Sequence, residues 1–152
     1  MSHSRRYLDQ VANIANEIDH EVLERIAVGL VNLRKCDGRL FILGVGGSAA
    51  NASHMVNDFR KIARIEAYAP TDNVSELTAR TNDEGWDTVF AEWLKVSRAG
   101  AGDAVFVLSV GGGDADRNVS VNIVRALEEA QRLKLRIYGI VGRSDGHTAR
   151  VA

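Results

Sequence analysis

His54 and Asp58 lie four residues apart in a segment that the sequence predicts to be helical from Ser48 to about Ile65. Residues at this spacing share one face of a helix. An imidazole beside a carboxylate could act as acid and base on one substrate, or could supply two ligands to a zinc ion. The alternative is a His–Asp pair that faces solvent. A zinc site would also need further ligands, and no CxxC or HxxxH motif is present to supply them.

The helix that carries this pair begins at a glycine turn, in which Gly46 and Gly47 follow an apolar run and precede Ser48. Glycines let the backbone approach a ligand, and free N–H groups at a helix N-terminus with a serine hydroxyl favour an anion such as phosphate. The turn is not a Walker loop, which needs Gly-Lys-Ser/Thr, and it is not a GxGxxG fingerprint, because Ala49 fills the third glycine position. The alternative is tight helix–strand packing with Ser48 as a simple helix cap.

A second glycine-rich turn runs from Ser109 to Ser120 and has the character of another anion-binding loop. Asp114 and Asp116 argue against a bare phosphate lying close to them, although Arg117, Asn118 or Ser120 could offset the repulsion. The candidate binding residues of this turn are Ser109, Gly111, Gly112, Asn118 and Ser120.

Two further turns are predicted. A polar turn between two helices contains Asn82 and Asp83, which could bind sugar hydroxyls or cap the following helix. A third glycine-rich turn, 142–146, follows the last predicted strand.

The predicted elements place the glycine-rich turns together. Apolar runs predict strands at 39–46, 103–110 and 136–142, with a weaker strand at 65–70. Periodic patterns predict helices at 4–35, 48–65, 72–81, 85–97 and 119–133. This alternation indicates an α/β fold with a doubly wound parallel sheet. Such sheets bind ligands beyond the carboxyl ends of their strands, which is where all three glycine-rich turns fall.

The long N-terminal helix has an apolar stripe that includes Tyr7, Val11, Ile14 and Ile18. Such a stripe must be buried, and the sequence favours equally a partner subunit and the chain's own sheet. Asp19 could cap a second helix or lie on a polar face.

Composition narrows the class of protein. At 152 residues the chain is predicted to form one domain, with a helical segment at 1–37 and a sheet core at 38–152. A net charge of −1 gives no reason to expect direct nucleic-acid binding. The polar N-terminus and the shortness of the longest apolar run, Leu40–Val45, predict neither a signal peptide nor a membrane span. A single cysteine, Cys36, suits the reducing cytoplasm.

Three segments resemble, in order, the sugar isomerase (SIS) family, and within it the sedoheptulose 7-phosphate isomerases, also called phosphoheptose isomerases: GVGGSAANASHMVNDF, TDNVSELTARTNDEGWDTVFAEWL and GDAVFVLSVGGG. The resemblance implies a flavodoxin-like three-layer sandwich. It also implies a homo-oligomer, a tetramer or dimer, with N-terminal helices in a central bundle and active sites at subunit interfaces. The implied reaction is aldose–ketose isomerisation of sedoheptulose 7-phosphate, with zinc in several members.

The resemblance also implies roles for individual residues. By position, Ser48 would contact the phosphate, and Ser109 would be the first serine of the phosphate loop. His54 would be a zinc ligand, and Asp58 falls where the family has a catalytic or metal-binding glutamate. Asp83 matches a substrate-contacting aspartate.

The chain departs from the family pattern in four respects. Its loop SVGGGDADRNVS is longer and poorer in hydroxyls than the family's, and Asp58 is one methylene shorter than glutamate. Val45 occupies a position that is commonly asparagine. The family's final helix, which supplies a glutamine and a histidine, is expected to be absent from this chain, and His147 is predicted to lie in a turn that does not match it.

Three functions are therefore predicted. The first is a phosphoheptose isomerase that transfers a proton through an enediolate. The second is a non-catalytic SIS module that binds a phosphosugar or a protein partner such as a replication initiator. The third is an isomerase acting on another phosphosugar, because the altered loop could change what is held.

Overall fold

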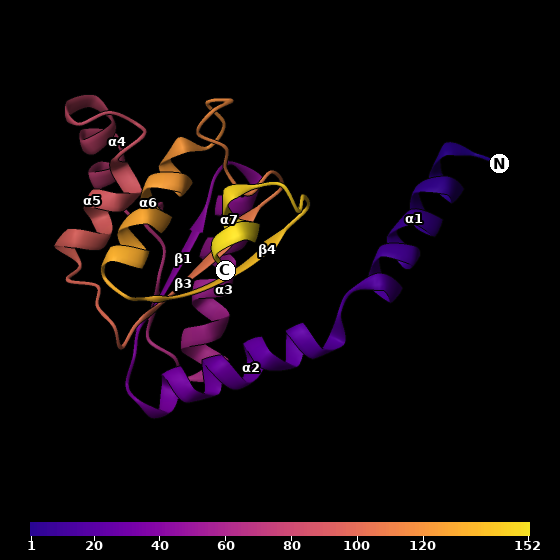
Figure 1. The fold of residues 1–152 in the computed structure, drawn as a ribbon, viewed down its shortest axis with the longest axis horizontal. Helices are drawn as coiled ribbons and strands as arrows, with labels where there is room; N and C mark the ends of the chain where they lie inside the picture. The colour runs from indigo at the N-terminus through magenta and orange to yellow at the C-terminus, as the bar shows by residue number, and fades with distance from the viewer. The chain divides into compact units, whose positions relative to one another are not determined.

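The computed structural model describes residues 1–152, which form two compact units, Met1–Val31 and Asn32–Ala152. The N-terminal segment holds two helices, α1 (His3–Glu17) and α2 (His20–Lys35), drawn in indigo and violet in Figure 1. The prediction of one continuous helix over 4–35 is wrong. Asp19 ends it, because Asp19 Oδ1 accepts hydrogen bonds from the amides of Glu21 (2.9 Å) and Val22 (3.2 Å) and caps α2.

The apolar stripe of α1 is exposed. No residue of α1 is buried, and Tyr7 and Ile14 are 60% and 61% exposed. Within its own unit this helix therefore finds no apolar partner, although an amphipathic helix gains most of its stability from packing.

The second unit contains a four-stranded sheet in the order β2–β1–β3–β4, with every neighbouring pair parallel. The strands are β1 (Leu40–Gly44), β2 (Ala67–Tyr68), β3 (Ala104–Ser109) and β4 (Arg136–Val141). Leu40 pairs with Ala104 and Val105 pairs with Ile137, so β1, β3 and β4 end at the same edge. The predicted parallel α/β sheet is confirmed.

The helices of this unit connect the strands. They are α3 (Gly47–Asp58), which continues as a π-helical turn (Phe59–Ala63), α4 (Val74–Asp83), α5 (Val89–Val96), α6 (Val121–Arg132) and α7 (His147–Val151). In Figure 1 α5 and α6 run side by side. No helix is both long enough and apolar enough to cross a membrane.

Alternate residues of the central strands face opposite layers, as strand geometry requires. Phe41, Leu43, Val105 and Val107 point to one face, where they form the main core with buried residues of α5 and α6 such as Phe90 and Leu127. Gly44, of opposite parity, faces α3, and a Cβ there would lie 2.4 Å from the carbonyl oxygen of Ser48. A glycine is therefore required where α3 crosses the end of β1.

The amino ends of β1 and β3 are joined by an ion pair. The Arg39 guanidinium donates to both carboxylate oxygens of Asp103, from Nε at 3.2 Å and from Nη2 at 2.8 Å. The same group donates to the carbonyls of Ser97 and Arg98. The hydrogen bonds that its guanidinium donates to Asp103 raise the pKa of Arg39, so the guanidinium stays charged.

Two boundaries differ from the sequence predictions. Asn82 and Asp83 form the last turn of α4 and do not lie in a turn between helices, since α4 runs two residues further than predicted. The segment after β4 was predicted to be a turn, but His147 begins α7. Its second residue, Thr148, is fully buried and donates to the carbonyl of Gly112 at 2.7 Å, which holds this short helix in place.

Candidate functional site

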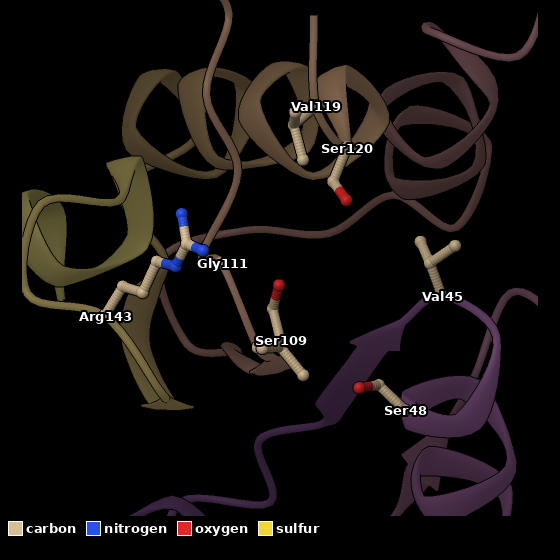
Figure 2. Close-up of a pocket in the computed structure, with 8 residues that line it drawn as sticks. Val45, Ser48, Ser109, Gly111, Val119, Ser120 and Arg143 are labelled. Carbon is tan, nitrogen blue, oxygen red and sulfur yellow. The ribbon is translucent and has the colours of Figure 1, made fainter. Parts of the chain in front are cut away.

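A cavity of about 410 Å³ opens at the carboxyl ends of β1 and β3. Its walls come from the turns that follow β1, β3 and β4 and from the start of α6, and Figure 2 shows the side chains that line it. It is lined by Val45, Ser48, Ser109, Val110, Gly111, Val119, Ser120 and Arg143. The predicted meeting of the glycine-rich turns is confirmed, because parallel strands in register end at one edge.

Three serine hydroxyls converge on this cavity from three different elements (Figure 2). Ser48 lies in the first turn of α3, and Ser109 ends β3. Ser120 precedes α6 with a left-handed backbone (φ 48°, ψ 47°) and makes no capping hydrogen bond with its side chain. A non-glycine residue in this conformation is uncommon and costs of order 1 kcal/mol, so the surrounding structure holds Ser120 with its hydroxyl toward the cavity.

The helix N-terminus beside Ser48 offers fewer free amides than the sequence predicts. The amide of Ser48 donates to the carbonyl of Val45 (3.2 Å), and that of Ala49 donates to the carbonyl of Gly46 (3.0 Å). Gly46 adopts φ 60°, and its α-carbon and that of Gly47 face open space. The amides of Ser48 and Ala49 are therefore engaged, and at this end of the cavity an anion would meet the hydroxyl of Ser48.

The loop after β3 is folded back on itself. Asp114 and Val119 exchange two backbone hydrogen bonds of 2.8 Å. The Asp114 carboxylate accepts from the amide of Arg117 (3.0 Å) and forms an ion pair with its Nε (3.3 Å). Asp114 and Asp116 do not line the cavity, so the predicted repulsion of a phosphate does not apply there. The amide of Asn118 donates to the carbonyl of Ala115, and Asn118 also lies outside the cavity lining.

Backbone hydrogen bonds join this loop to the turn between β4 and α7. The amide of Gly142 donates to the carbonyl of Val110 (3.0 Å), that of His147 to Gly113 (2.8 Å) and that of Thr148 to Gly112 (2.9 Å). Arg143 sits between these anchors and lines the cavity. Sequence reasoning missed Arg143, although the third glycine-rich turn to which it belongs was placed at this edge.

His54 and Asp58 make contact but lie outside the cavity lining. His54 Nε2 is 3.3 Å from Asp58 Oδ2, which confirms that the two residues share a helix face. Their side chains are 77% and 46% exposed. His54 follows Ser48 by six residues, a rotation that turns it about 120° away from Ser48 around the helix. The structure gathers no set of three or more histidine, cysteine or acidic side chains that could hold a metal ion.

The other predicted residues also lie outside the lining. Asn82 Nδ2 donates to Asp83 Oδ1 at 2.8 Å, and both side chains are exposed on α4. Gly46, Gly47 and Gly112 shape the turns without forming the cavity wall. Within one chain the structure thus brings together Ser48, Ser109, Gly111 and Ser120 as predicted, and it separates them from His54, Asp58, Asn82, Asp83 and Asn118.

Comparison with known proteins matches the SIS domain to residues 6–142. A probable phosphoheptose isomerase of Thermoplasma volcanium is 34% identical over 151 residues, which are 96% of this chain and 74% of that protein. A probable phosphoheptose isomerase of Thermoplasma acidophilum is 30% identical and covers 98% of this chain and 81% of its own length. The solved structure of phosphoheptose isomerase GmhA from Neisseria gonorrhoeae superposes with a TM-score of 0.81 at 28% identity, over 98% of this chain and 81% of that one. The chain belongs to the SIS domain family.

Proposed function

We propose that this protein is a phosphosugar isomerase that interconverts sedoheptulose 7-phosphate and a heptose 7-phosphate. The observation that carries the proposal is the cavity at the carboxyl ends of the strands, where three hydroxyls and one guanidinium converge. The names of the relatives support the same reaction, since the proteins of Thermoplasma volcanium and Syntrophotalea carbinolica, at 34% and 28% identity, are both named as phosphoheptose isomerases.

The proposed reaction moves one proton between adjacent carbons. A base removes a proton from carbon 1 of the ketose, and the enediolate that forms is protonated at carbon 2, while a hydroxyl proton moves from O1 to O2. Product and substrate therefore have the same composition. In this proposal the phosphate lies in the cavity, and the Asp58 carboxylate takes and returns the carbon-bound proton. His54, in contact with Asp58 at 3.3 Å, orients that carboxylate and donates to the developing oxyanion.

His54 and Asp58 are exposed, so the proton transfer would take place at the surface of the single chain and not in its cavity. Neither residue lines the cavity of its own chain. We therefore propose that the reacting end of the site is completed at a contact between two copies of the chain, as the family resemblance implies, with Asp83 as a further substrate contact.

Zinc stays a proposal, and the residues of this chain alone do not fit a complete site. Bound zinc would supply a Lewis acid that polarises the substrate carbonyl. His54 and Asp58 would provide two of the three protein ligands that a catalytic zinc needs, and no third donor joins them.

We also propose that the chain forms a homo-oligomer, a tetramer or a dimer, through the exposed stripe of α1. Placing a charge in that stripe, as in Ile14→Glu, is expected to dissociate the oligomer because a buried carboxylate would lose its water. Sedimentation equilibrium would measure the mass. Asn16→Glu, on the opposite side of the same helix, is the matched control and is expected to leave the mass unchanged. A wild-type mass of one chain would contradict the proposal.

Proton NMR of the protein with sedoheptulose 7-phosphate in heavy water tests the catalytic proposal. Aldose signals, and deuterium at the carbon next to the carbonyl, are expected. Repeating the measurement with zinc and then with a chelator separates a metal requirement from proton transfer itself. Unexchanged substrate in both conditions would contradict the isomerase.

A second candidate is a non-catalytic SIS module, favoured by the separation of His54 and Asp58 from the cavity. Broadened substrate signals without exchange would support it. For either function we propose the cytoplasm as the location, because Cys36 is an exposed free thiol and reducing conditions preserve such a group.

A further inference from the structure

We infer that Arg143 supplies the positive charge that holds the phosphate group of the substrate. The loop after β3 lines the cavity with the neutral hydroxyls of Ser109 and Ser120 and with no charged side chain. The inference deepens the proposed function and rests on it. It concerns a residue in the turn between β4 and α7, which belongs to the third glycine-rich turn but is not among the binding residues that the sequence predicts.

Arg143 is the only charged side chain that lines the cavity. In Figure 2 its guanidinium points toward the space bounded by the hydroxyls of Ser109 and Ser120. The nearby charges are paired with one another, because Arg117 lies 3.3 Å from Asp114 and 3.7 Å from Asp145. Arg143 itself forms no ion pair of 4.0 Å or less, so its charge is free to meet an anion.

The other side chains that line the cavity carry no charge, whereas a phosphate ester carries about −1.5 to −2 at neutral pH. Ser109 Oγ accepts a hydrogen bond from the amide of Gly112 at 2.9 Å, which leaves its own proton free to donate. The amides of Ser48 and Ala49 donate to neighbouring carbonyls. Three neutral hydroxyls therefore leave the negative charge uncompensated. Charge-assisted bonds from arginine are about twice as strong as neutral ones and pair with two phosphate oxygens at once.

The backbone around Arg143 is fixed to the loop that forms the opposite wall. Gly142 is tied to Val110, and on the other side His147 and Thr148 are tied to Gly113 and Gly112. A Cβ on Gly146 would lie 2.2 Å from the carbonyl oxygen of Gly111, which shows how closely the two turns approach. The backbone of Arg143 is thus held at a fixed position relative to Ser109 and Gly111, as a preorganised binding residue requires.

Isothermal titration calorimetry with inorganic phosphate tests the inference. Arg143→Gln is expected to weaken phosphate binding by about 10- to 100-fold, the range for a lost hydrogen bond to a charged group. Arg143→Lys keeps the positive charge but lacks the planar guanidinium, so its phosphate affinity is expected to lie between those of the wild type and Arg143→Gln. Arg136→Gln is the matched control, since it removes an exposed arginine from the other end of the same strand and should leave the affinity unchanged.

Two further titrations separate the phosphate from the rest of the ligand. Sedoheptulose 7-phosphate is expected to lose affinity in Arg143→Gln as inorganic phosphate does, whereas unphosphorylated sedoheptulose is expected to bind wild type and variant alike. Thermal unfolding checks that the variants are folded. Equal phosphate affinity in wild type and Arg143→Gln would overturn the inference, and so would the absence of phosphate binding by the wild type.

A separate measurement, the entry of deuterium into sedoheptulose 7-phosphate, tests the isomerase proposal. Exchange whose KM is the same in wild type and Arg143→Gln would overturn the role of Arg143 and leave the isomerase standing. Phosphate binding that depends on Arg143, without any exchange, would support the inference and contradict the isomerase.

Discussion

Replacing Asp103 with alanine is expected to lower the free energy of unfolding by about 3–5 kcal/mol, the range for removing one partner of an ion pair, because here the carboxylate is buried and its four donors would lose their acceptor. The Asp103 side chain is 9% exposed and accepts four hydrogen bonds, from the amides of Arg39 and Gly100 and from Nε and Nη2 of Arg39. Alanine would leave these donors without an acceptor at the amino ends of β1 and β3. For a domain of this size the melting temperature should fall by about 6–20 °C.

Two variants distinguish the stability lost with the Arg39–Asp103 contact from the effect of removing any carboxylate charge. Asp103→Asn keeps the shape and one acceptor oxygen, so a smaller loss is expected. Glu92→Ala breaks the exposed pair between Glu92 and Lys95, which at 2.6 Å is just as short, and is expected to cost less than about 1 kcal/mol. Denaturant titration followed by circular dichroism gives all three values. Similar losses for Asp103→Ala and Glu92→Ala would show that the Arg39–Asp103 contact does not stabilise the sheet.

The sheet and the cavity could be predicted from the sequence for two physical reasons. A strand buried on both faces is continuously apolar, so β1, β3 and β4 stand out as apolar runs. Parallel strands in register bring the residues that follow them to one edge, and so Ser48, Ser109 and Ser120 could be grouped without coordinates. The strong strands were placed to within two residues of their observed ends.

The break between α1 and α2 shows what a periodic pattern leaves undecided. The apolar stripe continues from Ile14 through Ile18 to Val22, so hydrophobic spacing alone predicts one helix. The side chain of Asp19 offers the backbone a local alternative by capping the next turn. The sequence identified this residue as a possible cap, but the choice between cap and polar face depends on energies of about 1 kcal/mol.

The sequence could not predict that Arg143 lines the cavity or that the His54–Asp58 pair lies outside it, for different reasons. Arg143 has no spacing that marks it, and it reaches the cavity only because backbone hydrogen bonds dock its turn against the loop after β3. For His54 and Asp58 the spacing correctly predicted a shared helix face. It could not predict which way that face points, because the rotation of α3 is fixed by close packing at Gly44 and by the burial of Ala52.

Asp58→Asn is expected to slow the entry of deuterium into sedoheptulose 7-phosphate by about 10²- to 10⁴-fold, the usual contribution of a general base. Asparagine has nearly the same shape as aspartate and still contacts His54, but its amide cannot take a proton from carbon. Asp58 does not line the cavity, so the affinity for inorganic phosphate is expected to stay the same. Asp58→Glu restores the glutamate of the family pattern and, because it keeps the base, is expected to retain exchange.

Glu92→Gln is the matched control, since Glu92 is likewise a partly exposed carboxylate in a helical ion pair, with 36% of its side chain exposed against 46% for Asp58. It lies on α5 and should leave exchange unaffected. The exchange rate is read from proton NMR in heavy water, and phosphate affinity from calorimetry on the same samples. A loss of exchange with phosphate binding intact would assign Asp58 to the reacting end and the cavity to the phosphate end of one substrate. Exchange at the wild-type rate in Asp58→Asn would remove the His54–Asp58 pair from the mechanism and leave the carbon-bound proton to a different base.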